Sequence, residues 1–288
     1  MPVNTPVIDR VSTYPGRVKL TPVVGEENVY DMVRADEPRV LGTLINKALL
    51  DQKAYTLTSN VTIYGNGSTG NDATGTGEST APYKTIQRAI NTIPKNLGGL
   101  SAVIDIAAGT YDEVLSVDNF SNGRLYLGAV DKAVTISGLS VSRSIDVVSY
   151  ISNIKRTEKT SNFLIRVVHV GKVLINKNLV LDGGLGTGIS CLVAAHGGIL
   201  TSESGITLTI NNSENTCIYS FFGGMIHLDS LAGTGNTGRG MYVDTGGVVS
   251  YKSSTLSAPL GNVTIAGGRI WTGTQTDAPS GLTPASVE

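Results

Sequence analysis

The 288-residue sequence has few charged and few aromatic side chains, at 16% and 6% of the chain, and it contains two cysteines and three histidines. Its formal charge is −1, so nothing favours nucleic acid or an anionic membrane surface as a partner. No apolar run is long enough to cross a bilayer, and we expect no membrane insertion. The opening residues, MPVNTPVIDR, lack the basic and apolar regions of a secretory signal, so we expect a chain made in the cytoplasm without a signal peptide.

Glycine, by contrast, is abundant at 35 residues, and five segments in the second half of the chain align without a gap around one glycine. The aligned glycines are 26, 26, 23 and 21 residues apart, a range in which one supersecondary unit stacks on the next to bury a shared core. The sequence therefore predicts a solenoid. The segments are Ile165–Ile175, Cys191–Thr201, Cys217–His227, Gly240–Ser250 and Gly261–Trp271, with aligned glycines Gly171, Gly197, Gly223, Gly246 and Gly267.

The repeats consist of short runs of Val, Ile, Leu, Thr, Tyr and Ser interrupted by Gly, Asn and Ser, which favours strands over helices. We therefore expect an all-β chain coiled as a parallel β-helix of about seven coils, with residues at one offset stacked in columns about 4.8 Å apart. The column three places after each aligned glycine is predicted to point inward and to form an aliphatic stack. Its members are Leu174, Leu200, Ile226, Val249 and Ile270.

The rest of the chain divides by composition. The first residues are rich in proline and do not share the repeat, and a glycine-rich stretch without an apolar period follows them. The next segment has apolar residues at helical spacing and ends at Pro94; these residues are Tyr83, Ile86, Ala89, Ile90 and Ile93. We expect this helix to cover the open edge of the first coil. The predicted units are an attachment segment (1–53), a linker (54–82), the β-helix (83–271) with its capping helix (83–94), and an extended tail (272–288).

Cysteine and histidine give little indication of chemistry. Cys191 and Cys217 share one column of adjacent coils, so a bridge is sterically conceivable, but we favour buried free thiols because Cys on an inward face usually acts as a small apolar residue. His169, His196 and His227 fall at three different offsets from the aligned glycines, so they are not predicted to converge on a metal ion. We expect no metal site and no cofactor.

Two stretches resemble known families. The string YGNGSTGNDATGTGESTAPYKTIQRAINTIP, followed by VIDIAAGTYDEVLSV, resembles the opening of pectate-lyase-like right-handed parallel β-helices, which occur in phage tail spikes and in pectin esterases. The earlier stretch VIDRVSTYPGRVKLTPVVGEENVYDMVRADEPRVLGTLINKALLDQ resembles the N-terminal segment of baseplate and tail-appendage proteins in phages of Gram-positive bacteria. Together the two matches cover roughly the first 117 residues.

The resemblance implies a virion protein. It implies that residues 1–53 bind other baseplate or tail proteins, that the chain forms a homotrimer, and that the right-handed β-helix projects toward a polysaccharide on the host surface. The expected function is that of a structural subunit of a phage tail, such as a tail fibre or receptor-binding appendage, and not that of an enzyme. A polysaccharide depolymerase of the glycosidase type is the alternative.

One pair of carboxylates could support that alternative. Six places after the aligned glycines stand Lys177, Glu203, Asp229 and Lys252, so the two carboxylates are expected one coil apart, roughly 5 Å by backbone, between two ammonium groups. This spacing is near the one that a retaining glycosidase needs for its acid and its nucleophile. The other interpretation is a solvated charge ladder in which each carboxylate has a lysine neighbour.

Aromatic side chains are the candidates for glycan binding without cleavage, because Tyr and Trp serve well where one edge of a ring stays in contact with water. Tyr219 and Tyr242 share a column, in which ring packing is the competing interpretation. The four candidates are Tyr219, Tyr242, Tyr251 and Trp271.

Overall fold

The computed structural model describes residues 56–158, 160, 162–184 and 188–272, together with the backbone of five short strands at 11–12, 18–22, 30–34, 38–40 and 283–284. The chain divides into two compact units, Met1–Tyr55 and Thr56–Glu288. In the first unit β1 (Val11–Ser12) pairs antiparallel with β4 (Pro38–Val40), and β2 (Val18–Pro22) pairs antiparallel with β3 (Tyr30–Arg34). The expected attachment role of residues 1–53 concerns side chains outside the described residues.

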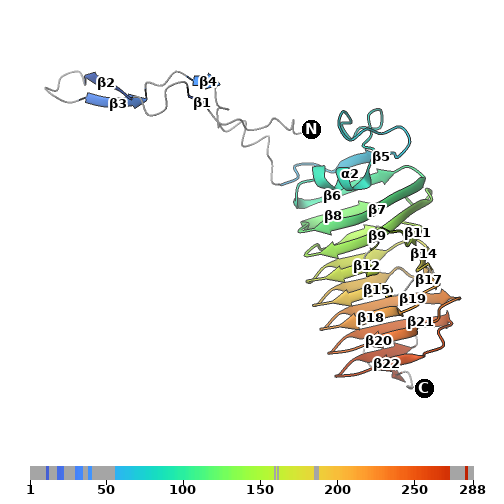
Figure 1. The fold of residues 1–288 in the computed structure, drawn as a ribbon. Coiled ribbons are helices and arrows are strands. Elements are labelled where there is room, and N and C mark those ends of the chain that lie inside the picture. The colour runs from blue at the N-terminus through green and yellow to red at the C-terminus, as the bar shows by residue number, and fades with distance from the viewer. Residues whose placement is uncertain are drawn as a thin grey trace. The chain divides into compact units, whose positions relative to one another are not determined.

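The second unit is a parallel β-helix of about seven coils with a single described α-helix, which confirms the predicted fold class (Figure 1). Each coil contributes strand segments to three parallel stacks, which we call A, B and C in chain order. Stack A contains β5 (Val61–Gly65), the end of β6 (Asn96–Ile106), β8 (Ser121–Leu127), β10 (Val147–Ser149), β13 (Lys172–Ile175), β16 (Ile199–Ser202), the starts of β19 (Met225–Gly233) and β21 (Val248–Leu256), and β23 (Arg269–Thr272).

Stacks B and C complete each coil. Stack B contains the starts of β7 (Gly109–Asp118) and β9 (Val134–Ser142), then β11 (Asn153–Lys155), β14 (Leu179–Asp182), β17 (Thr207–Asn211) and the ends of β19 and β21. Stack C contains the ends of β7 and β9, then β12 (Phe163–Val168), β15 (Ser190–Ala195), β18 (Thr216–Phe221), β20 (Arg239–Val243) and β22 (Asn262–Thr264). At the far end β24 (Thr283–Pro284) pairs antiparallel with β23.

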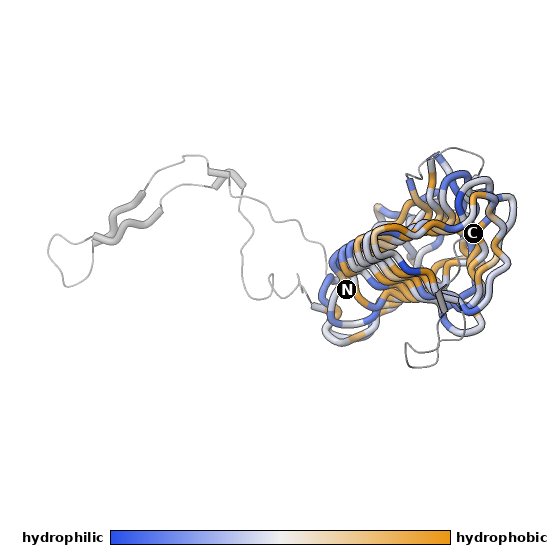
Figure 2. The backbone as a smooth tube through the Cα atoms, turned by 90° about the horizontal axis from the view of Figure 1, so that it is seen from below, coloured by the Kyte–Doolittle hydropathy of each residue, from blue (hydrophilic) through white to orange (hydrophobic). Residues whose placement is uncertain are grey.

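Aliphatic columns fill the interior, and Figure 2, which looks along the coils, shows hydrophobic residues recurring at the same places in successive coils. In stack A the inward column runs through Val173, Leu200, Ile226, Val249 and Ile270, all at most 4% exposed. The prediction was correct for four of its five members. Leu174 is the exception, because Val173 pairs with Leu200 while Leu174 pairs with Thr201 on the outer face.

The turn from stack C to stack A explains this one-residue error. Five of these turns, from residue 169 onward, place two residues in the left-handed region and then a glycine. A Cβ atom on the glycine after the left-handed pair would lie 2.1 Å from the carbonyl oxygen of Val167 at Gly198, and 2.1 Å from that of Ala194 at Gly224. Close backbone approach therefore fixes this third position as glycine, and Gly171 is its member in the first aligned segment. The left-handed pairs are His169–Val170, His196–Gly197, Phe222–Gly223, Thr245–Gly246 and Ala266–Gly267.

The predicted capping helix is present as α2 (Ile86–Thr92), shorter than the expected 83–94. Its apolar face buries Ile86, Ala89 and Ile90 against the first coil. Thr85 is the N-cap, and its hydroxyl accepts a hydrogen bond from the Arg88 backbone N–H.

The glycine-rich stretch is not a linker. Strand β5 lies inside it and pairs in register with β6, so the β-helix begins well before residue 83. The following loop is folded on its own side chains, because Asn66 and Asn71 each accept two backbone hydrogen bonds from the residues two and three places later. The lack of an apolar period predicted a linker, because the pairing of β5 with β6 is not visible in the local composition.

Both cysteines are free and buried, in agreement with the preferred interpretation. Cys191 and Cys217 occupy neighbouring positions in β15 and β18, one residue before the paired Leu192 and Ile218. Burial raises the pKa of Cys191 to about 12 and the pKa of Cys217 to about 11. Both thiols are therefore protonated at neutral pH and belong to the core.

Candidate functional site

The candidate carboxylates lie at the corner between stacks A and B. Glu203 follows β16 in an exposed turn, and Asp229 lies within β19, which runs through the corner without a break. Thr201 pairs with His227 in adjacent coils. Glu203 lies two residues after Thr201, and Asp229 lies two residues after His227. The structure thus keeps Glu203 and Asp229 in neighbouring coils, as the sequence pattern predicted.

Asp229 is held by contacts on both sides. Its Oδ1 lies 2.5 Å from Lys252 Nζ in the following coil, and its Oδ2 accepts a 2.8 Å hydrogen bond from the Gly205 backbone N–H in the preceding one. The hydrogen bond from Lys252, followed by that from Gly205, lowers the pKa of Asp229. Asp229 therefore stays ionised at neutral pH and fixes the turn that contains Glu203.

The Glu203 side chain is exposed and makes no hydrogen bond or ion pair with another described residue. Its backbone N–H donates to the Ile175 carbonyl of the preceding coil, and its carbonyl closes the turn by accepting from the Ile206 N–H. In a retaining mechanism one carboxyl donates a proton while the other attacks as an anion. An ionised Asp229 matches the anionic role, so Glu203 is the member left for the acid. The contact of Asp229 with Lys252 is also the contact that a structural charge ladder produces.

Lys177 does not belong to this column. The correct register pairs Ile175 with Ser202, so Asn176 and not Lys177 lies beside Glu203. The Lys177 ammonium instead donates a 2.6 Å hydrogen bond to the Lys132 carbonyl. The error has the same origin as that at Leu174, since Gly171 occupies the third position of its turn and not the second.

Two of the four aromatic candidates, Tyr219 and Tyr242, contact each other through their rings. Tyr219 and Tyr242 pair in register on the outer face of stack C, with ring centroids 5.2 Å apart in an edge-to-face arrangement. Phe221 stacks on Tyr219 at 4.4 Å, and the Arg239 guanidinium lies 5.6 Å from the Tyr242 ring centroid. These rings form a half-buried aromatic group that the sequence pattern had indicated only in part.

The other two aromatic candidates belong to stack A. Tyr251 packs against the core, and its burial raises the pKa of its hydroxyl. Trp271 pairs with Ser250 at the last coil. The four candidates therefore do not form one binding surface.

Two histidines share a column, which corrects the expectation that all three differ. His169 and His196 both open a turn from stack C to stack A, and their rings stack at 5.3 Å. His227 lies apart on stack A, where its Nδ1 is 2.5 Å from Ser250 Oγ and burial lowers its pKa. Within the part of the chain that the structure describes, no three His, Cys, Asp or Glu residues gather as metal ligands.

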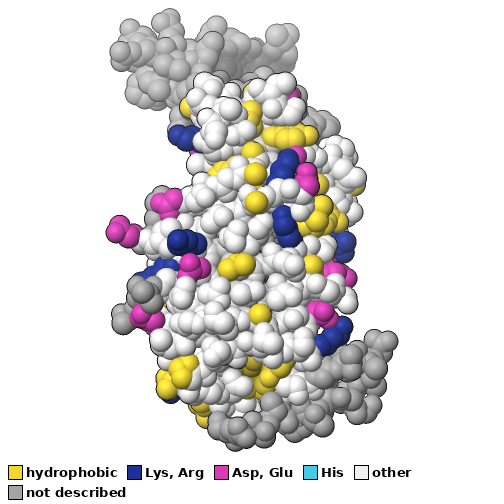
Figure 3. Space-filling model, turned by 90° about the vertical axis from the view of Figure 1, so that its right-hand side faces the viewer, with side chains coloured by type: hydrophobic (Ala, Val, Ile, Leu, Met, Phe, Trp, Pro, Cys, Tyr) yellow, Lys and Arg dark blue, Asp and Glu magenta, His cyan; other side chains and the backbone are white. Residues whose placement is uncertain are grey.

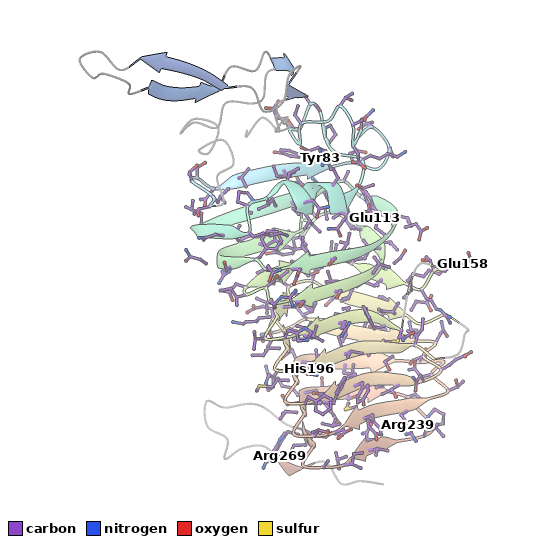
Figure 4. All side chains as sticks on the ribbon, turned by 60° about the vertical axis from the view of Figure 1, so that its left-hand side comes forward. Tyr83, Glu113, Glu158, His196, Arg239 and Arg269 are labelled. Carbon is purple, nitrogen blue, oxygen red and sulfur yellow. The ribbon has the colours of Figure 1, made fainter. Side chains whose placement is uncertain are left out.

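Tyr111 and Glu113 belong to the stretch that resembles pectate-lyase-like β-helices, and their side chains hydrogen-bond to the backbone of the first coil. Both carboxylate oxygens of Glu113 accept backbone hydrogen bonds at the start of α2, from Ile86 at 3.0 Å and from Gln87 at 2.9 Å. The Tyr111 hydroxyl donates to the Ala107 carbonyl and accepts from the Gly67 N–H. Figure 4 shows Glu113 in the first coils and His196 farther along the β-helix.

Asp72 completes this arrangement. Its carboxylate accepts hydrogen bonds from the backbone N–H groups of Lys84 and Thr85 and from the Thr85 hydroxyl. Burial opposes its ionisation, but the hydrogen bonds from Thr85 and Lys84 outweigh burial and lower the pKa of Asp72. The three donors follow Asp72 by twelve and thirteen residues, so the local sequence does not reveal these contacts.

The described charged side chains do not gather into a large patch on the one face that Figure 3 shows. On the face shown in Figure 3, Lys, Arg, Asp and Glu are scattered, and uncharged side chains and backbone cover most of the area. Lys132 with Asp105 and Arg143 with Asp118 are ion pairs between adjacent coils. Such pairs add little stability when exposed, and they leave no strong field to attract a charged ligand.

Comparison with known families supports the fold of the first coils. Residues 68–120 match the family described as "Protein of unknown function (DUF1565)", a family of β-helix-like proteins. The matched range covers the loop, α2, β6 and β7, where Asp72, Tyr111 and Glu113 make the contacts above. No curated protein and no solved structure matches the chain. No described helix is both long and apolar enough to span a membrane.

Proposed function

We propose that this chain is a structural subunit of a phage tail, baseplate or phage-tail-like particle that contributes to attachment to the host surface. In this proposal residues 1–53 join other tail proteins, several copies assemble as a homotrimer, and the β-helix displays a surface toward host polysaccharide. The phage assignment rests on the sequence resemblance of the N-terminal segment and of the first coils. Its location is the virion.

The observation that carries the proposal is the continuous parallel ladder from β5 to β23. Adjacent coils are joined by parallel strand pairs along this ladder, and the columns inside are almost fully buried. Such a ladder resists bending, because each coil contributes hydrogen bonds and buried apolar area to its neighbours. A rigid rod displayed in several copies suits a binding appendage, since multivalency strengthens weak contacts.

The test uses purified particles from the bacterium that produces them. Gold-labelled antibodies against the chain are expected to decorate the tail or baseplate in electron micrographs. The isolated full chain is expected to co-sediment with cell-wall polysaccharide of the host. Absence of label from particles that carry intact tails would refute the virion assignment.

One observation favours the depolymerase alternative, namely the ionised Asp229 beside the unpartnered Glu203. Incubation of the full chain with host polysaccharide, followed by an assay for new reducing ends, decides between the two functions. Under the structural proposal no ends appear. Release that is abolished by Glu203→Gln but unaffected by Glu158→Gln, a control at another exposed carboxylate, would establish the enzyme.

A further inference from the structure

Exposed apolar side chains concentrate on one edge of the β-helix. Among the described residues, six large hydrophobic side chains are exposed, and four of them lie in the turns from stack C to stack A. We call this set of turns, residues 143–146, 169–171, 196–198, 222–224, 245–247 and 265–268, the turn edge. The four residues are Ile145 at 44%, Val170 at 68%, Phe222 at 51% and Ile265 at 44% exposed.

Val170 is the least expected of them. Its φ of 57° lies in the left-handed region, which is costly for a β-branched residue, and the four equivalent positions in later coils are all glycine. Its side chain is mostly exposed, so packing inside this chain does not compensate the strain. A strained and exposed apolar residue indicates a contact with another molecule.

The turn edge carries a row of projecting side chains next to positions without side chains. In the five turns with a left-handed pair, the first residue of the pair forms a ridge. In this ridge the His196 ring centroid lies 5.3 Å from that of His169 and 5.1 Å from that of Phe222. At the second left-handed position Val170 projects from its turn, whereas Gly223, Gly246 and Gly267 carry no side chain in theirs. A Cβ atom at any of these three glycines would meet no atom within 4 Å, so the space beside the ridge is open there.

The outer face of stack C continues this surface. Tyr219, Phe221 and Tyr242 lie half-buried on that face, and Val193, which pairs with Tyr219, is 8% exposed. The ring of Phe221 lies 5.2 Å from that of Phe222, which joins the face to the ridge. Figure 4 shows His196 and Arg269 on the side of the turn edge, and Arg239 on the other side, where β20 begins.

We propose that the turn edge and the adjoining outer face of stack C bind a second copy of this chain, aligned parallel to the first. The ridge repeats once per coil, at a spacing of about 4.8 Å. A partner can match the ridge along its whole length only if its own surface repeats at the same spacing, and another copy of the β-helix does. The open positions at Gly223, Gly246 and Gly267 lie next to the ridge, so side chains of one copy have room over the glycines of the next. Contacts of this head-to-tail kind close into a ring when the rotation from one copy to the next divides a full turn.

The available area suits this partner. Five coils span about 24 Å along the axis, and the strands of stack C with the turn edge span roughly 25 Å across it. The product of these two lengths is a flat area of roughly 600 Å². The accessible surface of the side chains is larger than the flat area, and it approaches the ~800 Å² that each partner buries in a standard interface. The inference deepens the proposed function, on which it rests only for the presence of several copies.

Cross-linking of the full chain tests the contact. Val170→Cys is compared with Val130→Cys, because both valines are exposed to nearly the same extent, 68% and 67%, and only Val170 lies on the turn edge. The native Cys191 and Cys217 are buried and give a low background. A short bis-maleimide is expected to join copies through residue 170 and not through residue 130.

Sedimentation velocity gives a second measurement. Phe222→Asp is expected to raise the dissociation constant of the oligomer at least tenfold, because it buries a charge in the ridge, whereas Leu260→Asp, 62% exposed and off the turn edge, leaves it unchanged.

The outcomes separate the inference from the proposed function. If the wild-type chain is oligomeric but residue 170 does not cross-link and Phe222→Asp has no effect, the copies meet elsewhere and only the inference fails. A wild-type chain that stays monomeric at all concentrations refutes the inference and the multi-copy part of the proposed function. If Phe222→Asp abolishes polysaccharide binding without changing the oligomer, the turn edge is a glycan site and the inference is wrong.

Discussion

The neighbouring glycines Gly223 and Gly224 allow a sharp test of the corrected register. Gly223 is left-handed, with φ of 72°, and a Cβ atom there would meet nothing within 4 Å. At Gly224 a Cβ atom would lie 2.1 Å from the Ala194 carbonyl oxygen of the preceding coil. The two substitutions to alanine therefore probe different physical constraints at adjacent positions.

The magnitudes follow from these constraints. Alanine in the left-handed region costs about 1–2 kcal/mol, partly offset by about 0.4–1 kcal/mol from the reduced freedom of the unfolded chain. We expect Gly223→Ala to lower the free energy of unfolding by about 1 kcal/mol. Gly224→Ala must separate two coils by roughly 1 Å to relieve the overlap, which disturbs the parallel ladder, and we expect a loss of about 3 kcal/mol or more.

Urea unfolding measures both variants. Far-UV circular dichroism follows the whole ladder, and fluorescence of the single tryptophan, Trp271, follows the last coil. Gly198→Ala repeats the test one coil earlier, where the distance to the Val167 carbonyl oxygen is also 2.1 Å. Equal losses for Gly223→Ala and Gly224→Ala, or a larger loss for Gly223→Ala, would contradict the close-approach argument.

Three further predictions concern the first coils and the core. Glu113→Ala is expected to lower the free energy of unfolding by about 1–2 kcal/mol, because it removes both acceptors at the start of α2, and Glu113→Gln by less, as measured by urea unfolding. The lowered pKa of Asp72 means that its stabilisation is present above its ordinary value of 3.8 and is lost as the pH falls through its folded pKa. Asp72→Asn should therefore weaken the acid dependence of stability below about pH 4, and an unchanged dependence would exclude this role. Cys191 and Cys217 are expected to react with a maleimide only after unfolding, so rapid labelling of the native chain would contradict their burial.

The fold was predictable from the sequence because its main signal is local and repeated. Strand composition and a period of 21 to 26 residues suffice for a solenoid, and the inward positions of Leu200, Ile226, Val249 and Ile270 follow from alternation. The single misaligned segment shows the limit. A shared glycine does not reveal whether it serves a left-handed φ or a close approach, and Val170 occupies the position that is glycine in the other four turns.

The candidate site was predictable only in part. Glu203 and Asp229 are neighbours because one alignment covers both coils, but the contacts of Asp229 with Gly205 and Lys252 depend on turn geometry between strands. The stacking of His169 on His196 was missed for the same one-residue reason.

The amino-acid sequence by itself determined that this chain coils, because side-chain alternation and glycine spacing act over a few residues and repeat. Only the tertiary structure decided which glycine each turn needs, what Asp72 and Glu113 bind, and which edge carries the exposed Val170 and Phe222. These depend on contacts between residues more than ten positions apart, where a shift of one residue turns a side chain from the core to the surface.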